Sequence, residues 1–230
     1  MALMKKPWIT LVVIAIVTIV LASVGPVVYK AVTDRGTKTE SLTDGDAKAA
    51  STDINGSWKI VRGSGKNATS AGYTFHEILP GKSKETSGST NKVDGSFTVS
   101  DQKLTEGSAT TDLTSISSDV EKRDINVRRT ILDTDEFPKA VFTIKGPVDV
   151  SSLPGDGHAD ENTVPGTMEI HGVKKDIDVK LKALRTGKKL IVSSTIPINR
   201  RDYDIESPQF VAAKIDETGE INLLLTMEKQ

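Results

Sequence analysis

The sequence predicts an all-β fold, an antiparallel barrel of about eight strands with one short helical insertion, preceded by a single N-terminal transmembrane helix. Over residues 54–230, short runs of alternating apolar and polar residues are separated by Gly, Asn, Asp and Pro. This period of two is typical of strands. The connections at 171–175 and 186–188 have hairpin length and contain glycine. Because many twisted, one-sided strands usually close to remove their edges, we expect a barrel rather than an open sheet.

The chain begins with a short basic tail, residues 1–6, followed by residues 7–29, which carry no charge. At about 1.5 Å per helical residue, such a run spans the roughly 30 Å hydrocarbon core of a bilayer. We therefore expect an uncleaved single-pass anchor in the cell membrane. The lysines of the tail favour a cytoplasmic N-terminus and an extracytoplasmic domain. The alternative is a signal peptide cleaved near Ala22 and Ser23.

Residues 30–53 are polar and almost free of large apolar side chains. Such a segment buries too little apolar surface to order itself, so we predict a flexible linker. The barrel domain then covers residues 54–230.

Each predicted strand of the domain has one apolar face, which we place inward. Residues 81–91 read as a polar turn between two of these strands. The faces comprise Trp58 and Ile60; Ala71, Tyr73 and Phe75; Val93, Gly95, Phe97 and Val99; Ala109, Thr111 and Leu113; Phe142 and Ile144; Met168 and Ile170; Ile177, Val179, Leu181 and Ala183; Leu190, Val192, Ser194 and Ile196; Ile221, Leu223, Leu225 and Met227.

Residues 119–142 do not follow the strand pattern. Val120, Val127, Ile131 and Leu132 fall at spacings that share one helical face. We expect a short amphipathic helix, capped at its start by Asp119, that lays this face on the sheet and closes one end or side of the barrel.

The interior of a barrel of this size is either just filled by side chains or holds one slender ligand. Small residues on inward faces, among them Ala71, Gly95, Ala109, Gly166 and Ala183, reduce the volume that fills it. A solid apolar core stays the alternative. A cavity would suit a long apolar molecule, and we expect its lining to include Tyr73, Phe75, Phe97, Leu113, Phe142, Met168, Ile170 and Val192.

Composition excludes several other functions. The chain has no Cys, which removes thiol catalysis and cysteine metal sites, and its net charge of −1 comes from interspersed charges that do not suggest nucleic acid. No hydrolase, metalloprotease, phosphate-loop or dinucleotide fingerprint occurs. We expect neither metal nor cofactor, and no enzyme; catalysis by His76 or His171 is the least favoured alternative. The acidic loop at 155–162 reads as solvated.

Two arginines near the predicted barrel mouth have two interpretations. Arg123 adjoins Asp124 in sequence, so the two side chains point about 100° apart on a helix and each needs its own partner. The structural interpretation is that Arg123 or Arg200 ties helix to sheet through carboxylates or carbonyls. The functional one is that such an arginine binds an anionic head group such as pyrophosphate.

Several pieces, in this order, carry a family resemblance. They are Trp58 with Ile60, Gly95-Ser-Phe, Ser115-Ile116 leading to Arg123-Asp124, Leu132-Asp133 through Phe137-Pro138 to Phe142, Gly166-Thr-Met-Glu-Ile-His-Gly-Val-Lys-Lys, and Ile198-Asn-Arg-Arg-Asp-Tyr-Asp-Ile. By these pieces, residues 54–230 resemble the YceI-like family of lipocalin-like polyisoprenoid-binding proteins. Tyr203-Asp204 departs from the family, which tends to have Phe-Gly there.

The resemblance implies a lipocalin-like barrel that holds an isoprenoid chain in its lumen, with no established catalytic residues. It adds Tyr203 to the lining candidates and places the helix over the pocket. We therefore expect a membrane-anchored, extracytoplasmic binding or carrier protein for a polyisoprenoid or similar long apolar lipid. The alternative is a non-catalytic cell-envelope interaction module with a solid core. Whether the barrel forms a homodimer stays open.

Overall fold

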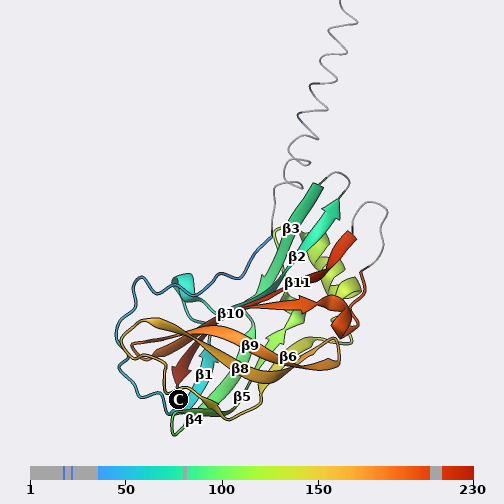
Figure 1. The fold of residues 1–230 in the computed structure, drawn as a ribbon. Helices are drawn as coiled ribbons and strands as arrows, with labels where there is room; N and C mark the ends of the chain where they lie inside the picture. Colours follow the sequence, from blue (N-terminus) through green and yellow to red (C-terminus); the bar gives the residue numbers. More distant parts are fainter. Residues whose placement is uncertain (1–17, 19–21, 23–35, 80–81, 208–213) are drawn as a thin grey trace, which may run out of the picture. The chain divides into compact units, whose positions relative to one another are not determined.

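The structure is a computed structural model that describes residues 18, 22, 36–79, 82–207 and 214–230 (Figure 1). The strands are β1 Gly56–Val61, β2 Ser70–Leu79, β3 Lys82–Thr90, β4 Val93–Ser100, β5 Lys103–Asp112, β6 Lys139–Ile144, β7 Val148–Asp149, β8 Ala159–Ile170, β9 Val173–Thr186, β10 Lys189–Asn199 and β11 Lys214–Lys229. The helical pieces are η1 Gly65–Asn67, η2 Leu113–Ser115, α2 Glu121–Asn126, η3 Val127–Ile131 and η4 Arg200–Tyr203.

Eight strands close into an antiparallel barrel, as the sequence predicts. Their order is β1-β4-β5-β6-β8-β9-β10-β11, and β11 pairs back with β1 through Met227 and Ile60. Strand β11 pairs with β10, and its 16 residues are also long enough to pair with two further strands in succession, which closes the barrel. Its C-terminal end pairs with β1, and its earlier part pairs with β2. The β2–β3 hairpin therefore continues the wall where β1 has ended (Figure 1).

Strand β3 replaces the predicted polar turn at 81–91. Its sequence, KSKETSGST, has no apolar side chain, so periodicity gave no sign of a strand. The segment is a strand because it pairs residue by residue with β2, from Ala71 with Thr90 to Leu79 with Lys82. Pairing across the hairpin satisfies the backbone groups of β3 that face β2, whatever the side chains are.

The helical insertion is present and packs its apolar face as expected. Val127 of η3 is buried with Leu113 and Ile116, and Ile131 and Leu132 pack against this cluster. The helical pieces end at Ile131, well before Pro138.

The predicted cap at Asp119 is wrong. Helix α2 begins after Val120, which makes no side-chain cap. The Asp119 carboxylate instead accepts a hydrogen bond from Arg123 Nη1 at 2.7 Å, because the two residues lie one helical turn apart. The neighbouring Asp124 is buried and accepts from the backbone N and the Oγ of Ser118, at 2.8 and 2.6 Å. Arg123 and Asp124 thus have separate partners, as predicted.

Residues 36–53, which we call the strap, differ from the flexible linker predicted at 30–53, because they lie along the outside of the barrel. Leu42 is buried against Leu184, Ile191 and Leu224 on the outer face of the sheet. One large apolar side chain in this segment was too little to predict from composition that the strap packs against the sheet. It suffices because the sheet offers a complementary apolar patch that only the fold assembles.

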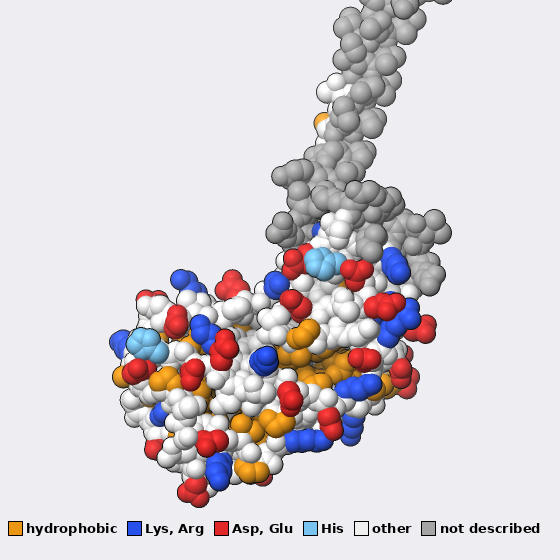
Figure 2. All heavy atoms as spheres, viewed as in Figure 1, with side chains coloured by type: hydrophobic (Ala, Val, Ile, Leu, Met, Phe, Trp, Pro, Cys, Tyr) orange, Lys and Arg blue, Asp and Glu red, His pale blue; other side chains and the backbone are white. Residues whose placement is uncertain are grey.

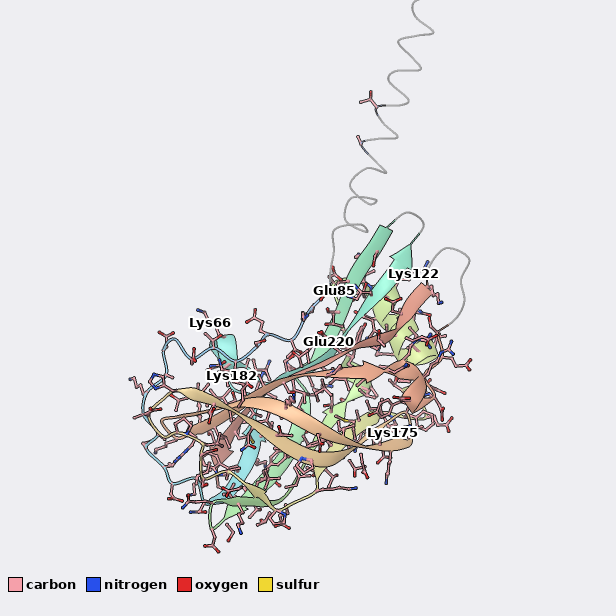
Figure 3. The ribbon with its side chains drawn as sticks, viewed as in Figure 1. Lys66, Glu85, Lys122, Lys175, Lys182 and Glu220 are labelled. Atoms are coloured by element: carbon pink, nitrogen blue, oxygen red, sulfur yellow. The ribbon has the colours of Figure 1, made fainter. Side chains whose placement is uncertain are left out.

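Polar contacts hold the strap along its length. Lys38 Nζ lies 3.1 Å from Glu85 and 3.6 Å from Glu220, whose side chains come from β3 and β11 (Figure 3). Near the other end, the backbone N of Ala50 donates to Gly155 O and that of Ser51 to Gly187 O, both at 2.8 Å. Residues 36–53 accordingly belong to the same compact unit as the barrel.

The predicted anchor, residues 7–29, falls outside the described residues except for Thr18 and Ala22. Within the described part of the chain, no helix is both long and apolar enough to cross a bilayer. The anchor stays a prediction.

Candidate functional site

The barrel is hollow. It encloses a cavity of about 240 Å³, whose lining comes from every strand of the closed barrel and from the helical insertion. Voids in packed protein interiors rarely exceed the size of a water molecule. A space of this size is therefore a feature of the fold, and the alternative of a solid core does not describe it.

Aromatic rings line the cavity without filling it, because each lies over a glycine of a neighbouring strand. Phe75 pairs with Gly219 and Phe97 with Gly107, and a side chain at either glycine would collide with the ring opposite. Phe142 lies over Gly166 in the same way, and Tyr73 over Gly88. A ring held flat against the wall covers backbone and leaves the centre of the barrel open.

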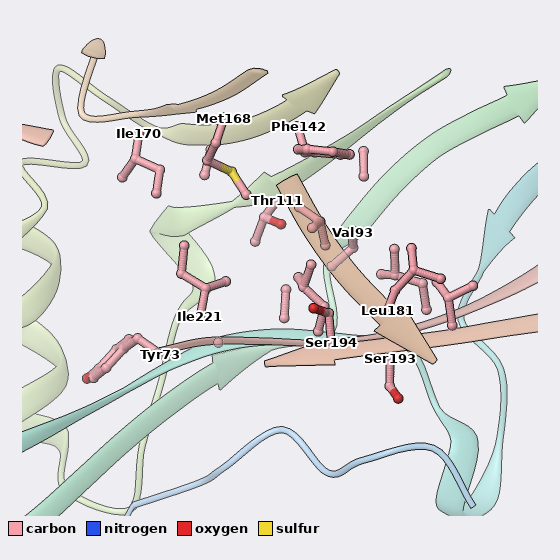
Figure 4. A pocket seen from close by; sticks show the side chains of 18 of the residues that line it. Tyr73, Val93, Thr111, Phe142, Met168, Ile170, Leu181, Ser193, Ser194 and Ile221 are labelled. Atoms are coloured by element: carbon pink, nitrogen blue, oxygen red, sulfur yellow. The ribbon is translucent and has the colours of Figure 1, made fainter. Parts of the chain in front are cut away.

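Eight of the nine residues predicted to bind a ligand line this cavity; several are labelled in Figure 4. They are Tyr73, Phe75, Phe97, Leu113, Phe142, Met168, Ile170 and Val192. Seven of them lie on strands, where their inward direction follows from strand alternation, a local property of the sequence; Leu113 lies in η2. That they bind a ligand stays a prediction.

Tyr203 is the exception, because it does not line the cavity. It lies in η4, beyond the end of β10, and is 2% exposed. It packs in a cluster with Met168, Ile170 and Ile196. Strand parity does not apply to a helical turn, so the resemblance alone had placed it in the lumen.

The two ends of the lumen are built differently. A cluster around Trp58, which also contains Val99, Val150 and Leu153, packs the end that holds β1 and the C-terminus (Figure 1). Trp58 is 1% exposed, and its indole N–H donates to Ile54 O at 2.7 Å. The helical insertion contributes Val127, Ile131 and Leu132 to the cavity lining.

Arg200 has a structural role in the fold. It is 7% exposed, and its guanidinium donates to Ile205 O at 2.7 Å and to Asp216 O at 3.2 Å. These bonds tie η4 to the start of β11. Arg123, the other predicted candidate, bonds Asp119 at 2.7 Å. Both arginines therefore have polar partners, but only Arg200 bonds the sheet, whereas Arg123 bonds Asp119 and Ser118 of its own segment.

The histidines lie outside the cavity lining. His76 is exposed on β2, and His158 Nδ1 lies 3.2 Å from Asp156 in an exposed loop. His171 contacts the Phe137 ring at a tilt, with ring centroids 4.4 Å apart. Within the described ranges, no three His, Asp or Glu side chains gather as a metal site. The chemistry that the lumen offers is burial of an apolar molecule.

The outer surface contrasts with the lumen. On the face drawn in Figure 2, basic and acidic side chains are interspersed, with short apolar stretches between them. Exposed ion pairs such as Lys145–Asp176 and Arg201–Glu217 join neighbouring elements. Such pairs contribute little to stability.

A closed antiparallel barrel with a hollow apolar lumen and a helical cover defines a lipocalin-like binding fold. The model of the YceI-like domain matches residues 58–227, and the chain belongs to that family. No curated protein matches the chain.

Two solved structures share the fold. One is a polyisoprenoid-binding domain from Saccharophagus degradans implicated in plant cell wall breakdown, 19% identical, with a TM-score of 0.58, covering 75% of this chain and 98% of its own. The other is BcnA from Burkholderia cenocepacia, 14% identical, with a TM-score of 0.55, covering 69% of this chain and 94% of its own. At these identities the likeness establishes the fold alone.

Proposed function

We propose that this protein binds or carries a polyisoprenoid or a similarly long apolar lipid in the lumen of its barrel. The hollow, apolar cavity is the observation that carries the proposal. Each methylene group that leaves water for such a lumen contributes about 0.8 kcal/mol before the costs of association, so a long chain binds without any catalytic group. The fold shared with the polyisoprenoid-binding domain supports this ligand class.

The proposal includes a location. An uncharged segment at residues 7–29 would anchor the chain in the cell membrane, with the barrel on the extracytoplasmic side. A lipid ligand resides in the bilayer, and an anchored receptor meets it at high local concentration. The anchor therefore suits the proposed ligand.

Lipid analysis of the full-length protein tests the function. After purification, native mass spectrometry of the intact chain is expected to show a bound species, and organic extraction is expected to release a long-chain lipid in about equimolar amount. A protein that carries no lipid and takes up no apolar fluorescent probe would contradict the proposal. It would favour the alternative of a non-catalytic interaction module.

A matched pair of variants sharpens this test. Ile170→Trp places an indole ring in the lumen, whereas Ile125→Trp places one on the helix surface, where Ile125 is 42% exposed. We expect the first change to reduce bound lipid and the second to leave it unchanged. Equal loss in both variants would argue against the lumen as the binding site.

A further inference from the structure

Two buried hydroxyl groups face the lumen without a hydrogen-bond partner. They are Tyr73 Oη and Thr86 Oγ1, and among the described residues they are the buried side-chain polar atoms that have none. Thr86 is 3% exposed. Buried polar groups are nearly always paired, because an unpaired one loses its bonds to water and gains nothing in return.

Other buried hydroxyls of the same hairpin do have partners. Thr74 Oγ1 lies 2.8 Å from Ser87 Oγ and 2.7 Å from Asn222 Oδ1 on the outer side of the wall. The outward hydroxyls of Thr74 and Ser87 are thus satisfied by the protein, as is the inward Thr90 Oγ1, which lies 2.6 Å from Ser115 Oγ. Tyr73 and Thr86, which point inward, are left unpaired.

The two unpaired hydroxyls belong to diagonally neighbouring residues on the lumen face of one hairpin. Tyr73 pairs with Gly88 and Phe75 with Thr86 across the same hairpin, so Thr86 lies two residues from Gly88 on the same face. Both line the cavity, and Figure 4 shows Tyr73 along its wall. The Tyr73 ring lies so close over Gly88 that a Cβ there would come within 2.8 Å of the hydroxyl oxygen. The glycine thus leaves room for this oxygen.

Both hydroxyls are available as donors. Burial raises the pKa of the Tyr73 phenol well above its ordinary value, so the phenol keeps its proton. A threonine hydroxyl donates one hydrogen bond and accepts others. Arg200, the cation that lines the cavity, is engaged with backbone carbonyls. The donors left unpaired in this wall are therefore neutral, which suits an uncharged acceptor oxygen.

We propose that Tyr73 and Thr86 form a polar subsite that binds an uncharged oxygen, such as a hydroxyl or carbonyl, on an otherwise apolar long-chain lipid. This inference rests on the proposed function and adds to it the class of ligand: an oxygen-bearing amphiphile rather than a hydrocarbon. The polar group lies inside the lumen, beside the cluster of Leu113, Ile116 and Val127. The chain then extends through the apolar part of the cavity.

Matched probes test the subsite. The delipidated full-length protein, held in an amphipathic polymer, is titrated with phytane, phytol and phytyl phosphate, and bound probe is counted by mass spectrometry. We expect phytol to bind more tightly than phytane. Tyr73→Phe and Thr86→Val, which remove one hydroxyl each, are expected to lower the phytol-to-phytane preference by about two- to tenfold.

Thr74→Val is the control, because it removes an outward hydroxyl of the same hairpin and should leave the preference unchanged. Neither Tyr73→Phe nor Thr86→Val should lower the melting temperature of the lipid-free protein, since neither hydroxyl has a partner to lose. Equal binding of phytane and phytol, an unchanged preference in both variants, or tighter binding of phytyl phosphate than of phytol would overturn the subsite. Binding of none of the three probes would overturn the proposed function itself.

Discussion

At the scale of single residues, the lumen depends on glycines as much as on aromatic rings. Phe75, Phe97 and Phe142 are large enough to fill much of a barrel interior. They do not, because Gly219, Gly107 and Gly166 let their rings lie against the wall. A residue without a side chain therefore sets the volume available to a ligand.

Gly219→Ala tests this role. A Cβ at this position would lie 2.6 Å from Phe75 Cγ, so the ring must leave the wall. The cavity beside Phe75 has space into which the displaced ring can move. We therefore expect the melting temperature of the lipid-free protein to change little and the amount of bound lipid to fall at least severalfold.

Gly45→Ala is its control, because an added Cβ there meets no heavy atom within 4 Å. The two variants are compared by native mass spectrometry and thermal unfolding. A Gly219→Ala protein that binds as much lipid as the Gly45→Ala protein would show that the ring position does not limit the lumen.

Tyr73 makes a second residue-scale prediction, on alkaline stability. Its pKa is raised chiefly by burial; Asp124, Glu77 and Asp119 add to the rise and Arg123 opposes it. The unfolded phenol loses its proton near pH 10, below the folded pKa. The contribution of the protonated Tyr73 phenol to the free energy of unfolding is thus intact below about pH 10 and is lost as the pH rises from there toward the folded pKa.

Urea unfolding between pH 8 and 11 measures this effect. We expect the midpoint of the original protein to fall above pH 10 more steeply than that of Tyr73→Phe, which has no proton to lose. Parallel pH profiles for the two proteins would mean that the Tyr73 phenol titrates alike in the folded and unfolded chains.

At the scale of elements, pairing partners decide what a segment becomes. Strand β3 is polar throughout, yet β2 holds it as a strand by backbone hydrogen bonds. Leu42 is the only large apolar residue of the strap, yet the outer face of β9, β10 and β11 holds the strap through Leu184, Ile191 and Leu224. The composition of either segment is therefore not enough to predict its structure.

Leu42→Ser should release the strap. Full burial of a leucine contributes roughly 1.5 to 3 kcal/mol, and Leu42 is 7% exposed. We expect faster tryptic cleavage at Lys38 and Lys48, with nearly unchanged thermal unfolding of the barrel. Glu40→Ser, at an exposed neighbouring position, serves as the control. Equal cleavage rates in the two variants would show that Leu42 does not hold the strap.

At the scale of the whole molecule, a hollow core lowers the stability of the empty protein and leaves space for a ligand. A cavity forfeits the contacts that a filled core would make, and a bound lipid restores them. A ligand that binds only the folded protein stabilises it by about 2.7 kcal/mol at a hundredfold excess over Kd. For a domain of this size, that corresponds to a rise in melting temperature of roughly 5 to 10 °C.

Delipidation followed by lipid addition measures this gain. We expect the extracted protein to melt at a lower temperature than the protein as purified, and phytol to restore the higher value. A short alcohol such as butanol, at the same concentration, should restore much less because it buries little apolar surface. A melting temperature that does not respond to phytol would indicate that the lumen stays empty.

Local sequence pattern was enough to predict the β class, the strand alternation that sends seven of the nine named side chains into the lumen, and the apolar face of the helical insertion. These are local properties, because neighbouring residues in a strand point to opposite faces whatever the strand pairs with. The tertiary structure alone decided strand β3, the docking of the strap, the place of Tyr203 outside the cavity, the rings over glycines and the two unpaired hydroxyls. Each of these depends on which residue of one strand faces which residue of another, and that register arises only when distant segments meet.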